Sequence, residues 1–242
     1  MPLLFVAGLC FSQVMTVYEK NGNVTRIPVD NIDRIIFESG GYSQESSDYV
    51  RDADGNMYRT VTIGHQVWMA ENLKTTRYND GTPIPEVRDF NQWNTLKSGA
   101  YIWYMNNADN KDKYGALYNW HAVNTNKLCP PGWHVPVREE WKALLDYLKS
   151  GWGQKLKVSG RQFWTRNSDD VTNETGFSAL PGGERQNVRG TFRHEGNVGY
   201  FWTSTSETGD RAYRYFLYDN SNGYSVGPIA REYGSSVRCI RD

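Results

Sequence analysis

One proline-rich stretch, LCPPGWHVPVREEWKALLDYL at residues 128–148, restricts the fold more than any other part of the chain. Pro130, Pro131 and Gly132 exclude a helix there and predict an extended arm. After Pro136, apolar side chains recur at the i, i+3, i+4, i+7 spacing of a buried helical stripe, namely Trp141, Leu144, Leu145 and Leu148. The stretch therefore predicts an aromatic-rich arm that leads at a fixed angle into a short amphipathic helix.

The composition suits one substantial domain with a small appendage in a chain of 242 residues. Aromatic residues make up 14% of a hydrophilic chain, which favours a loop-rich fold with several small aromatic clusters. The 27 basic and 27 acidic residues balance to zero formal charge, so there is no electrostatic reason to expect nucleic acid or an anionic membrane as a partner. No apolar run is long enough to predict an integral membrane span.

The N-terminal region predicts three short segments before the main domain. Residues 1–12, MPLLFVAGLCFS, resemble the apolar core of a secretion signal, with an ordinary buried strand as the alternative. Residues 13–38 predict a small β module, because VMTVYEK and VTRIPV flank a turn at Asn21-Gly22-Asn23 and the strand RIIFE follows. Residues 39–47, SGGYSQESS, are typical of a linker, and the main domain is expected over residues 48–242.

Two cysteines remain once the leader is removed, Cys129 and Cys239, and an even count suits an exported protein. A disulfide between them would close most of the main domain and stabilise it by about 4–5 kcal/mol in the chain-entropy model. Two separate buried thiols are the alternative.

The main domain shows further local signals. Residues 114–123 predict a first short helix, and residues 159–199 predict ordered loop. The runs GYFWTSTS, AYRYFLYDNS, GYSVGPIA and SSVRCIRD predict a closing antiparallel set of strands, with a turn at Asn222-Gly223. Residues 52–56, DADGN, resemble a calcium loop but lack the EF-hand ligands before and after it, so they predict a tight turn with Gly55 at positive φ.

Several collinear motifs resemble the Fibrobacter succinogenes major paralogous domain from about residue 52 to residue 242. They are DADGNMYRTVTIGHQVWMAENLKTTRYNDGTPIP, YGALYNWHAVNTNKLCPPGWHVPVREEW, GFSALPGGER, GYFWTSTS and SSVRCIRD. The resemblance implies a protein that is exported or attached to the cell surface, in the periplasm or outside the cell, as is typical of this domain in Bacteroidetes and their relatives. The N-terminal MTVYEKNGNVTRIPVDNIDRIIFE is also similar to a short module common in exported Bacteroidetes proteins.

VPVREEW and SVRC, which include Arg138–Trp141 and Val237–Cys239, are more distantly similar to motifs of the C-type-lectin-like fold as used by formylglycine-generating enzymes. This similarity implies an α+β domain with two short helices, a small twisted antiparallel sheet and long loops, next to the N-terminal β appendage. It also favours a disulfide between Cys129 and Cys239 that ties the proline-rich arm to the final strand.

Catalytic and metal chemistry find little support in the sequence. The four histidines are scattered without an HExxH or paired CxxC motif, so we expect no metal and no cofactor. An oxidase of the formylglycine-generating type would need free cysteines late in the chain, where only Cys239 occurs, and the serines lack a GxSxG elbow. We therefore expect no catalytic residues, with a hydrolase or oxidase on the same scaffold as the alternative.

Surface recognition is the remaining hypothesis. The calcium-dependent sugar motifs of lectins, EPN or QPD with WND, are absent. Aromatic faces beside amide groups suit sugars or protein partners, so the expected ligand-binding residues are Trp202, Asp219, Asn220, Asn222 and Tyr224. The alternative is that alternate strand residues belong to the core. The sequence thus predicts a non-catalytic binding or adhesion module for a glycan or a surface protein.

Overall fold

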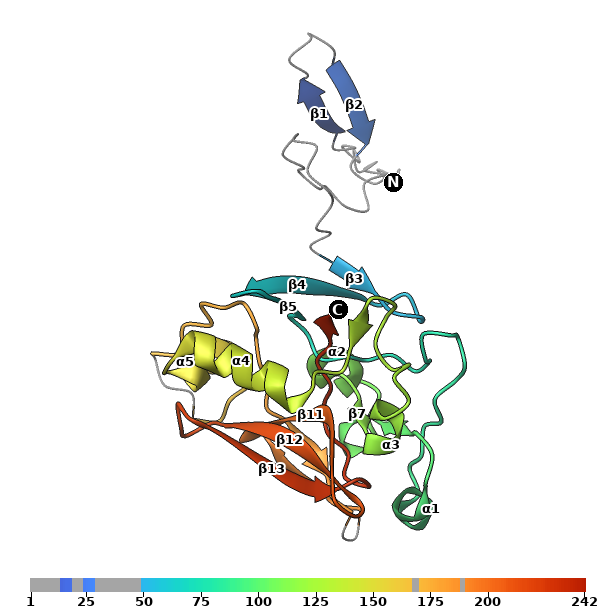
Figure 1. Cartoon of the computed structure of the whole chain (residues 1–242). Helices are drawn as coiled ribbons and strands as arrows, with labels where there is room; N and C mark the ends of the chain where they lie inside the picture. The colour runs from blue at the N-terminus through green and yellow to red at the C-terminus, as the bar shows by residue number, and fades with distance from the viewer. Residues whose placement is uncertain (1–13, 19–23, 29–48, 167–169, 188–189) are drawn as a thin grey trace, which may run out of the picture. The chain divides into compact units, whose positions relative to one another are not determined.

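The structure is a computed structural model of the chain, which describes residues 14–18, 24–28, 49–166, 170–187 and 190–242 (Figure 1). The chain divides into two compact units, Met1–Glu45 and Ser46–Asp242. In the first unit, β1 (Val14–Tyr18) pairs antiparallel with β2 (Val24–Pro28), which confirms two predicted strands. The predicted leader, the turn at residues 21–23, the strand RIIFE and the linker lie outside the described residues.

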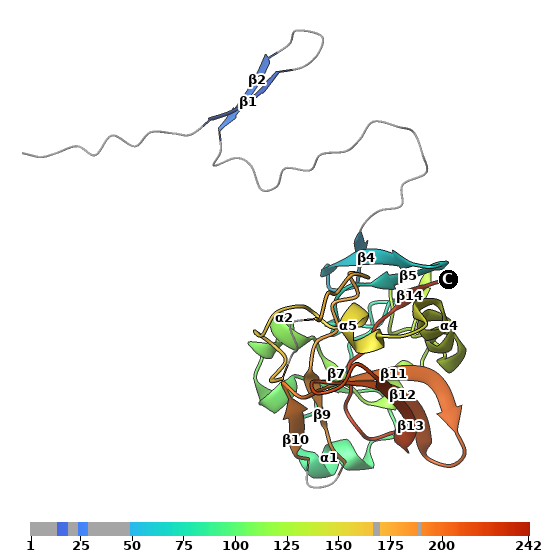
Figure 2. The same cartoon turned by 90° about the vertical axis from the view of Figure 1, so that its left-hand side faces the viewer.

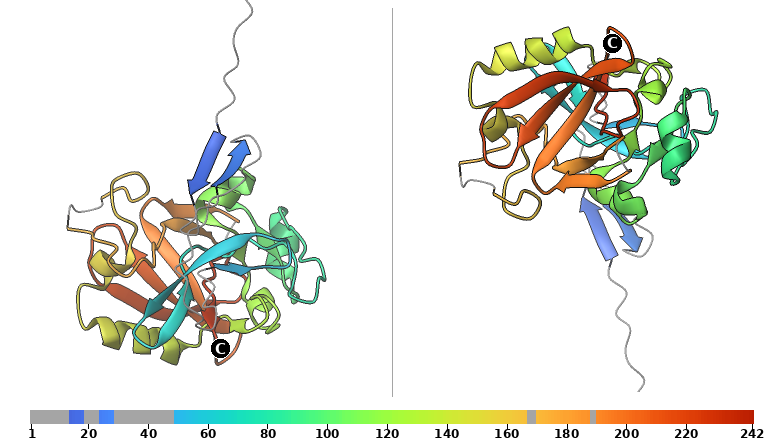
Figure 3. Two further views of the ribbon diagram at one scale, coloured as in Figure 1. Left: turned by 90° about the horizontal axis from the view of Figure 1, so that it is seen from above. Right: turned by 90° about the horizontal axis from the view of Figure 1, so that it is seen from below.

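The second unit contains two five-stranded sheets. The first has the order β3-β4-β5-β14-β8 and consists of β3 (Tyr49–Arg51), β4 (Met57–Ile63), β5 (Gln66–Met69), β14 (Ile240–Arg241) and β8 (Trp133–His134). The second has the order β10-β9-β11-β12-β13 and consists of β10 (Phe192–Glu195), β9 (Gly182–Arg185), β11 (Val198–Glu207), β12 (Arg211–Tyr218) and β13 (Tyr224–Ala230). The β4–β5 hairpin faces the viewer from above and the β11–β13 strands face the viewer from below (Figure 3).

Short helices and a small strand pair complete the described part of the unit. The helices are α1 (Phe90–Thr95), the 3₁₀ turn η2 (Tyr104–Asn106), α2 (Asn110–Tyr114), α3 (Trp120–Val123), α4 (Arg138–Leu148) and α5 (Trp152–Leu156). The strand pair is β6 (Tyr101–Ile102) with β7 (Leu117–Tyr118). Strands predominate over short helices, as an α+β domain requires, and the helices outnumber the two that were expected.

Three local predictions are wrong. The run SSVRCIRD does not join the closing antiparallel set, because its strand β14 pairs with β5 and β8 in the first sheet. Residues 114–123 are helical only over α3 and at the last residue of α2, because the Tyr118 backbone pairs with Tyr101 and with Ser235 in extended conformation. Residues 159–199 contain β9, β10 and the start of β11 rather than loop alone. All four residues of β9 are buried, so that strand has no polar–apolar alternation from which it could be recognised.

The helix α4 carries the predicted buried stripe and organises the core of this unit. Its four stripe residues are at most 6% exposed. The ring of Trp141 lies 5.1 Å from Trp68 of β5 and stacks at 5.0 Å on Tyr215 of β12. The helix therefore packs between the β4–β5 hairpin and the β11–β13 strands, as Figures 1 and 2 show.

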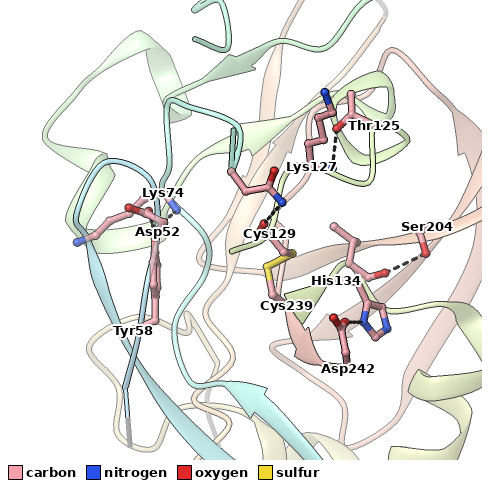
Figure 4. The surroundings of a disulfide bond; sticks show 12 residues. Asp52, Tyr58, Lys74, Thr125, Lys127, Cys129, His134, Ser204, Cys239 and Asp242 are labelled. Carbon is pink, nitrogen blue, oxygen red and sulfur yellow. Dashed lines mark hydrogen bonds and ion pairs between the residues drawn. A yellow bond between two sulfur atoms is a disulfide. The ribbon is translucent and has the colours of Figure 1, made fainter. Parts of the chain in front are cut away.

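The proline-rich arm is extended as predicted and contributes β8 beside β14. His134 pairs with Ile240 in antiparallel register. The disulfide between Cys129 and Cys239 is present, with their Cα atoms 6.0 Å apart (Figure 4). The arm is thus joined to the final strand both by backbone pairing and by a covalent bond.

The predicted tight turn at residues 52–56 is confirmed. Gly55 has a φ of +85°, in the left-handed region that glycine accepts without strain. The carboxylate of Asp52 accepts hydrogen bonds from the backbone N–H groups of Asp54 and Asn56 at 3.0 and 2.9 Å, and from the hydroxyl of Tyr58 at 2.5 Å. Its oxygens bind the turn itself, which explains the calcium-like sequence without a metal.

Candidate functional site

Four of the five predicted ligand-binding residues lie at the turn between β12 and β13. Asn220 and Asn222 are exposed, and Tyr224, the first residue of β13, is 36% exposed. The fifth predicted residue, Trp202, lies away from the turn in the middle of β11. The turn is therefore the part of the predicted site that could contact a ligand.

Trp202 cannot bind a surface ligand, so its prediction is wrong. The side chain is 0% exposed and belongs to the cluster that includes Trp120 and Tyr118. Its indole N–H donates to the carbonyl oxygen of Tyr118 at 2.8 Å, which satisfies its only polar group. The α3 segment covers this end of β11 on the face where an exposed aromatic ring was expected.

Asp219 is also buried, and its predicted role as a ligand contact is wrong as well. The residue is 4% exposed. Its Oδ2 atom accepts hydrogen bonds from Nε of Arg166 and from Nδ2 of Asn197, each at 3.0 Å. The carboxylate thus fixes the turn against neighbouring segments.

A buried lysine lies beneath the same turn. The Nζ atom of Lys157 donates to the carbonyl oxygens of Tyr218 at 3.1 Å, Ser221 at 3.3 Å and Asp219 at 3.4 Å. Burial lowers the pKa of this lysine, which is 1% exposed. Carbonyl oxygens arranged around one cation are also typical of calcium loops, and here an ammonium group takes that place. Lys157 follows α5 directly, and no motif in the sequence marks this contact.

The helix α5 holds the turn from its other side. The backbone N–H of Gly153 donates to the carbonyl oxygen of Asn222 at 2.9 Å. A Cβ atom at position 153 would lie 2.9 Å from the Cα of Asn222, so only glycine permits this close approach. The backbone of the turn is therefore held by contacts from outside the hairpin.

An aromatic pair, exposed at Tyr224 and half-buried at Trp152, borders the turn. The rings of Tyr224 and Trp152 meet edge to face with centroids 5.0 Å apart, and Tyr215 lies 5.8 Å behind Tyr224. The indole N–H of Trp152 donates to the carbonyl oxygen of Leu145 at 2.8 Å, which fixes the ring. We name the surface formed by Asn220, Asn222, Tyr224 and Trp152 the turn surface. Trp152 was not among the predicted residues, because it lies far away in sequence.

The turn surface combines aromatic rings with side-chain amides on a fixed backbone. Aromatic rings offer a large contact area with little loss of conformational entropy, and amides can both donate and accept hydrogen bonds. This chemistry suits the recognition of a neutral polar surface such as a sugar or a protein loop.

A histidine between two carboxylates lies on the arm. Nδ1 of His134 is 2.6 Å from Oδ1 of Asp242 (Figure 4). Its Nε2 is 2.9 Å from Oε1 of Glu140. Burial lowers the pKa of His134, but the hydrogen bonds to Asp242 and Glu140 outweigh burial and raise it above its ordinary value. The hydroxyl of Ser204 donates instead to the carbonyl of Val135 at 2.9 Å, so this histidine has no serine to activate.

A buried ion pair occupies the other face of the second sheet. Glu184 and Arg214 are 2% and 5% exposed, and their Oε2 and NH1 atoms lie 2.7 Å apart. The guanidinium group packs 4.1 Å from the ring of Tyr200, and burial raises the pKa of that tyrosine. These contacts support a structural role for the pair, because the charges are matched inside the fold.

The sequence profile of the family described as Fibrobacter succinogenes major domain matches residues 61–241. The chain belongs to this family. The match confirms the resemblance and includes both disulfide cysteines, α4 and the turn surface. No curated protein and no solved structure matches the chain.

Two further findings describe this Fibrobacter succinogenes major domain protein. Within the described residues, no group of three or more histidine, cysteine, aspartate or glutamate side chains could hold a metal ion. No helix in the same part of the chain is long and apolar enough to cross a membrane.

Proposed function

We propose that this chain is an exported, non-catalytic binding module that recognises a glycan or a protein partner at the cell surface through the turn surface. The observation that carries the proposal is the aromatic pair of exposed Tyr224 and half-buried Trp152 beside the amides of Asn220 and Asn222. The turn beneath them is held by Lys157, so little conformational freedom is lost when a ligand binds.

Export is supported by the disulfide between Cys129 and Cys239, because such bonds persist mainly in oxidising compartments. A C-type-lectin-like fold forms part of the same proposal. Its support is the combination of an extended arm tied to the final strand, a helix that follows the arm, and long connecting segments between short strands.

The non-catalytic part of the proposal is supported by the hydroxyl groups of β11. Thr203 donates to the carbonyl of Tyr213 at 2.9 Å, and Ser204 donates to the carbonyl of Val135. The hydroxyl oxygen of Thr205 accepts from the backbone N–H of Arg138 at 2.9 Å, at the first turn of α4. Each of these three hydroxyl groups therefore takes part in a structural hydrogen bond.

The test is a screen of the mature protein against immobilised glycans and candidate surface proteins, repeated with Tyr224→Ala. The matched control is Tyr147→Ala, because Tyr147 is a 60% exposed tyrosine outside the turn surface. We expect at least one ligand whose binding falls tenfold or more with Tyr224→Ala and stays unchanged with Tyr147→Ala. Binding that is equally tight in wild type and in Tyr224→Ala would contradict the proposed site. If the protein instead converted substrates from a test panel and bound no ligand stably, the proposal of a binding module would be wrong and an enzyme would be favoured.

A further inference from the structure

A cleft of about 670 Å³, which shares no residue with the turn surface, opens on the second unit. It lies between β4, the residues after β5, α2 and the segments 158–163 and 178–180. Its volume falls within the ~300–1,000 Å³ typical of small-molecule sites. Its apolar lining includes Ala70, Phe163 and Leu180, and its polar lining includes Arg59, Asp109 and Gln162. Apolar and hydrogen-bonding groups thus face one concave space.

A buried arginine ties two walls of this cleft together. Arg238 is 0% exposed, and its guanidinium group donates to the carbonyl oxygens of Met69 and Ser178, each at 3.1 Å, and of Phe177. Burial lowers the pKa of Arg238 to about 9. Met69 precedes the cleft residue Ala70, and Ser178 also lines the cleft, so the buried group links two segments of the lining. Removing a guanidinium group from water is unfavourable unless its hydrogen bonds are satisfied, as they are here.

The wall at Ser178 is held in an uncommon conformation. Ser178 has a φ of +53°, in the left-handed region that non-glycine residues rarely adopt. The side-chain amide of Asn173 maintains it, because its Oδ1 accepts from the Ser178 N–H at 2.9 Å and its Nδ2 donates to the Ser178 hydroxyl at 2.8 Å. Such strained residues persist where the surroundings enforce them, and they cluster at ligand sites.

Most charges around the cleft are already paired within the chain. The carboxylate of Glu71 binds Nε of Arg59 at 3.0 Å and the backbone N–H of Arg59 at 2.8 Å. Asp112 forms an ion pair with Lys74 at 2.7 Å. Its neighbour Lys113, which also lines the cleft, forms an ion pair with Glu195 at 3.2 Å. A charged ligand would have to compete with these pairs.

Two exposed polar side chains of the cleft lining remain available. Among the described residues, Asp109 and Gln162 make no side-chain hydrogen bond. A carboxylate accepts hydrogen bonds from hydroxyls, and a primary amide both donates and accepts them. An uncharged ligand that carries many hydroxyls can use both groups without breaking an ion pair.

We propose that this cleft binds an uncharged saccharide. The apolar face of a sugar ring packs against Phe163 and Leu180, and the ring hydroxyls bind Asp109 and Gln162. The walls are fixed by Arg238 before the ligand arrives, which limits the ordering that binding requires. This site is independent of the turn surface and goes beyond the function proposed there.

Isothermal titration with neutral hexasaccharides, namely cellohexaose, xylohexaose, mannohexaose and maltohexaose, tests the proposal on the mature chain. Hexagalacturonate and chitosan hexamer serve as charged counterparts. The variant is the double substitution Asp109→Ala with Gln162→Ala. The matched control is Asp210→Ala with Gln92→Ala, because these residues are of the same types and are also exposed.

We expect at least one neutral hexasaccharide to bind, with a Kd that rises tenfold or more in the cleft variant and stays unchanged in the control. Backbone amide shifts of the wild type, measured during the same titration, should change around residues 109–113 and 158–163. The proposal is overturned if no saccharide binds, if only charged saccharides bind, or if the cleft variant binds as tightly as the wild type.

Tyr224→Ala separates this site from the turn surface. Saccharide binding that is lost in the cleft variant and kept in Tyr224→Ala supports the cleft alone. If Tyr224→Ala abolishes binding of a protein or glycan and the cleft variant still binds it, the result supports the turn surface. It then counts against the cleft as the site for that ligand. Each proposal can therefore fail without the other.

Discussion

The ammonium nitrogen of Lys157 lies 3.1 Å from the carbonyl oxygen of Tyr218, the last residue of β12. Two more carbonyls of the same turn accept from it, and no carboxylate is hydrogen-bonded to it among the described residues. Backbone dipoles therefore balance a charge that is almost completely buried. The conformation of the turn surface consequently depends on a side chain from outside the hairpin.

Lys157→Met tests this dependence, because methionine keeps most of the side-chain length and removes the donor. We expect a loss of about 1–3 kcal/mol in unfolding free energy, since buried carbonyl oxygens lose their partner. Urea denaturation measures the loss, and the same change should weaken binding at the turn surface. The control is Lys142→Met at an exposed ion pair, where we expect almost no change in unfolding free energy because solvent screens the pair. Equal losses of unfolding free energy in both variants would show that the buried contact stabilises the fold no more than the exposed ion pair does.

Trp202 and Tyr224 should respond to alanine in opposite ways. Trp202→Ala removes a fully buried ring and should destabilise the protein by about 3–5 kcal/mol. Tyr224→Ala removes a partly exposed ring and should lose mainly its aromatic contacts, about 0.5–1.5 kcal/mol, while abolishing ligand binding. Thermal or chemical denaturation beside a binding assay separates the two effects. A small loss for Trp202→Ala would contradict its place in the core.

Loss of the disulfide should destabilise the second unit strongly. Cys129 and Cys239 are 110 residues apart, and closing a loop of that length contributes about 4–5 kcal/mol in the chain-entropy model. We expect the urea midpoint to fall when dithiothreitol is added. A double Cys129→Ala, Cys239→Ala variant should start at the lower midpoint and show no further response to the reductant. A wild type that is indifferent to reduction would argue that native contacts alone hold β8 to β14.

His134 should make stability depend on pH. Its pKa in the folded chain lies above the ordinary value of 6.5, so the protonated ring stabilises the fold below the unfolded pKa. This contribution is lost as the pH rises through the folded pKa. The difference in unfolding free energy between wild type and His134→Gln should therefore be larger at about pH 5 than at about pH 9. His65→Gln, at an exposed histidine, is the control. If wild type and His134→Gln differed in unfolding free energy by the same amount at both pH values, this prediction would be wrong.

The sequence predicted best the elements whose signal is local. The stripe of α4 repeats with helical period from Trp141 to Leu148, and the prolines before it exclude a helix, so both the arm and the helix are present as expected. The cysteine pair was expected from the leader and from the family resemblance, and it is confirmed. In each case the information lies within a short stretch or a single residue type.

Features that depend on distant contacts escaped prediction. Alternation along β11 placed Trp202 on one face, but it could not show that α3 covers that face. The cages around Lys157 and Arg238 consist of backbone carbonyls, which every residue carries, so no motif marks them. Trp152 joins the turn surface only because α5 packs against the turn. Sequence therefore located the turn without identifying what supports it.

The bond between Cys129 and Cys239 also determines how a pulling force would travel through the protein. Tyr224 lies inside the covalent loop that this bond closes, a short distance along the chain from Cys239. Tension applied to the turn surface by a captured ligand would pass along β13 and residues 231–239 to the sulfur bridge and then into the arm, without first unravelling β9, β11 and α4. When the unit is pulled between its N-terminal side and the turn surface, residues 130–223 would therefore carry no load along their backbone.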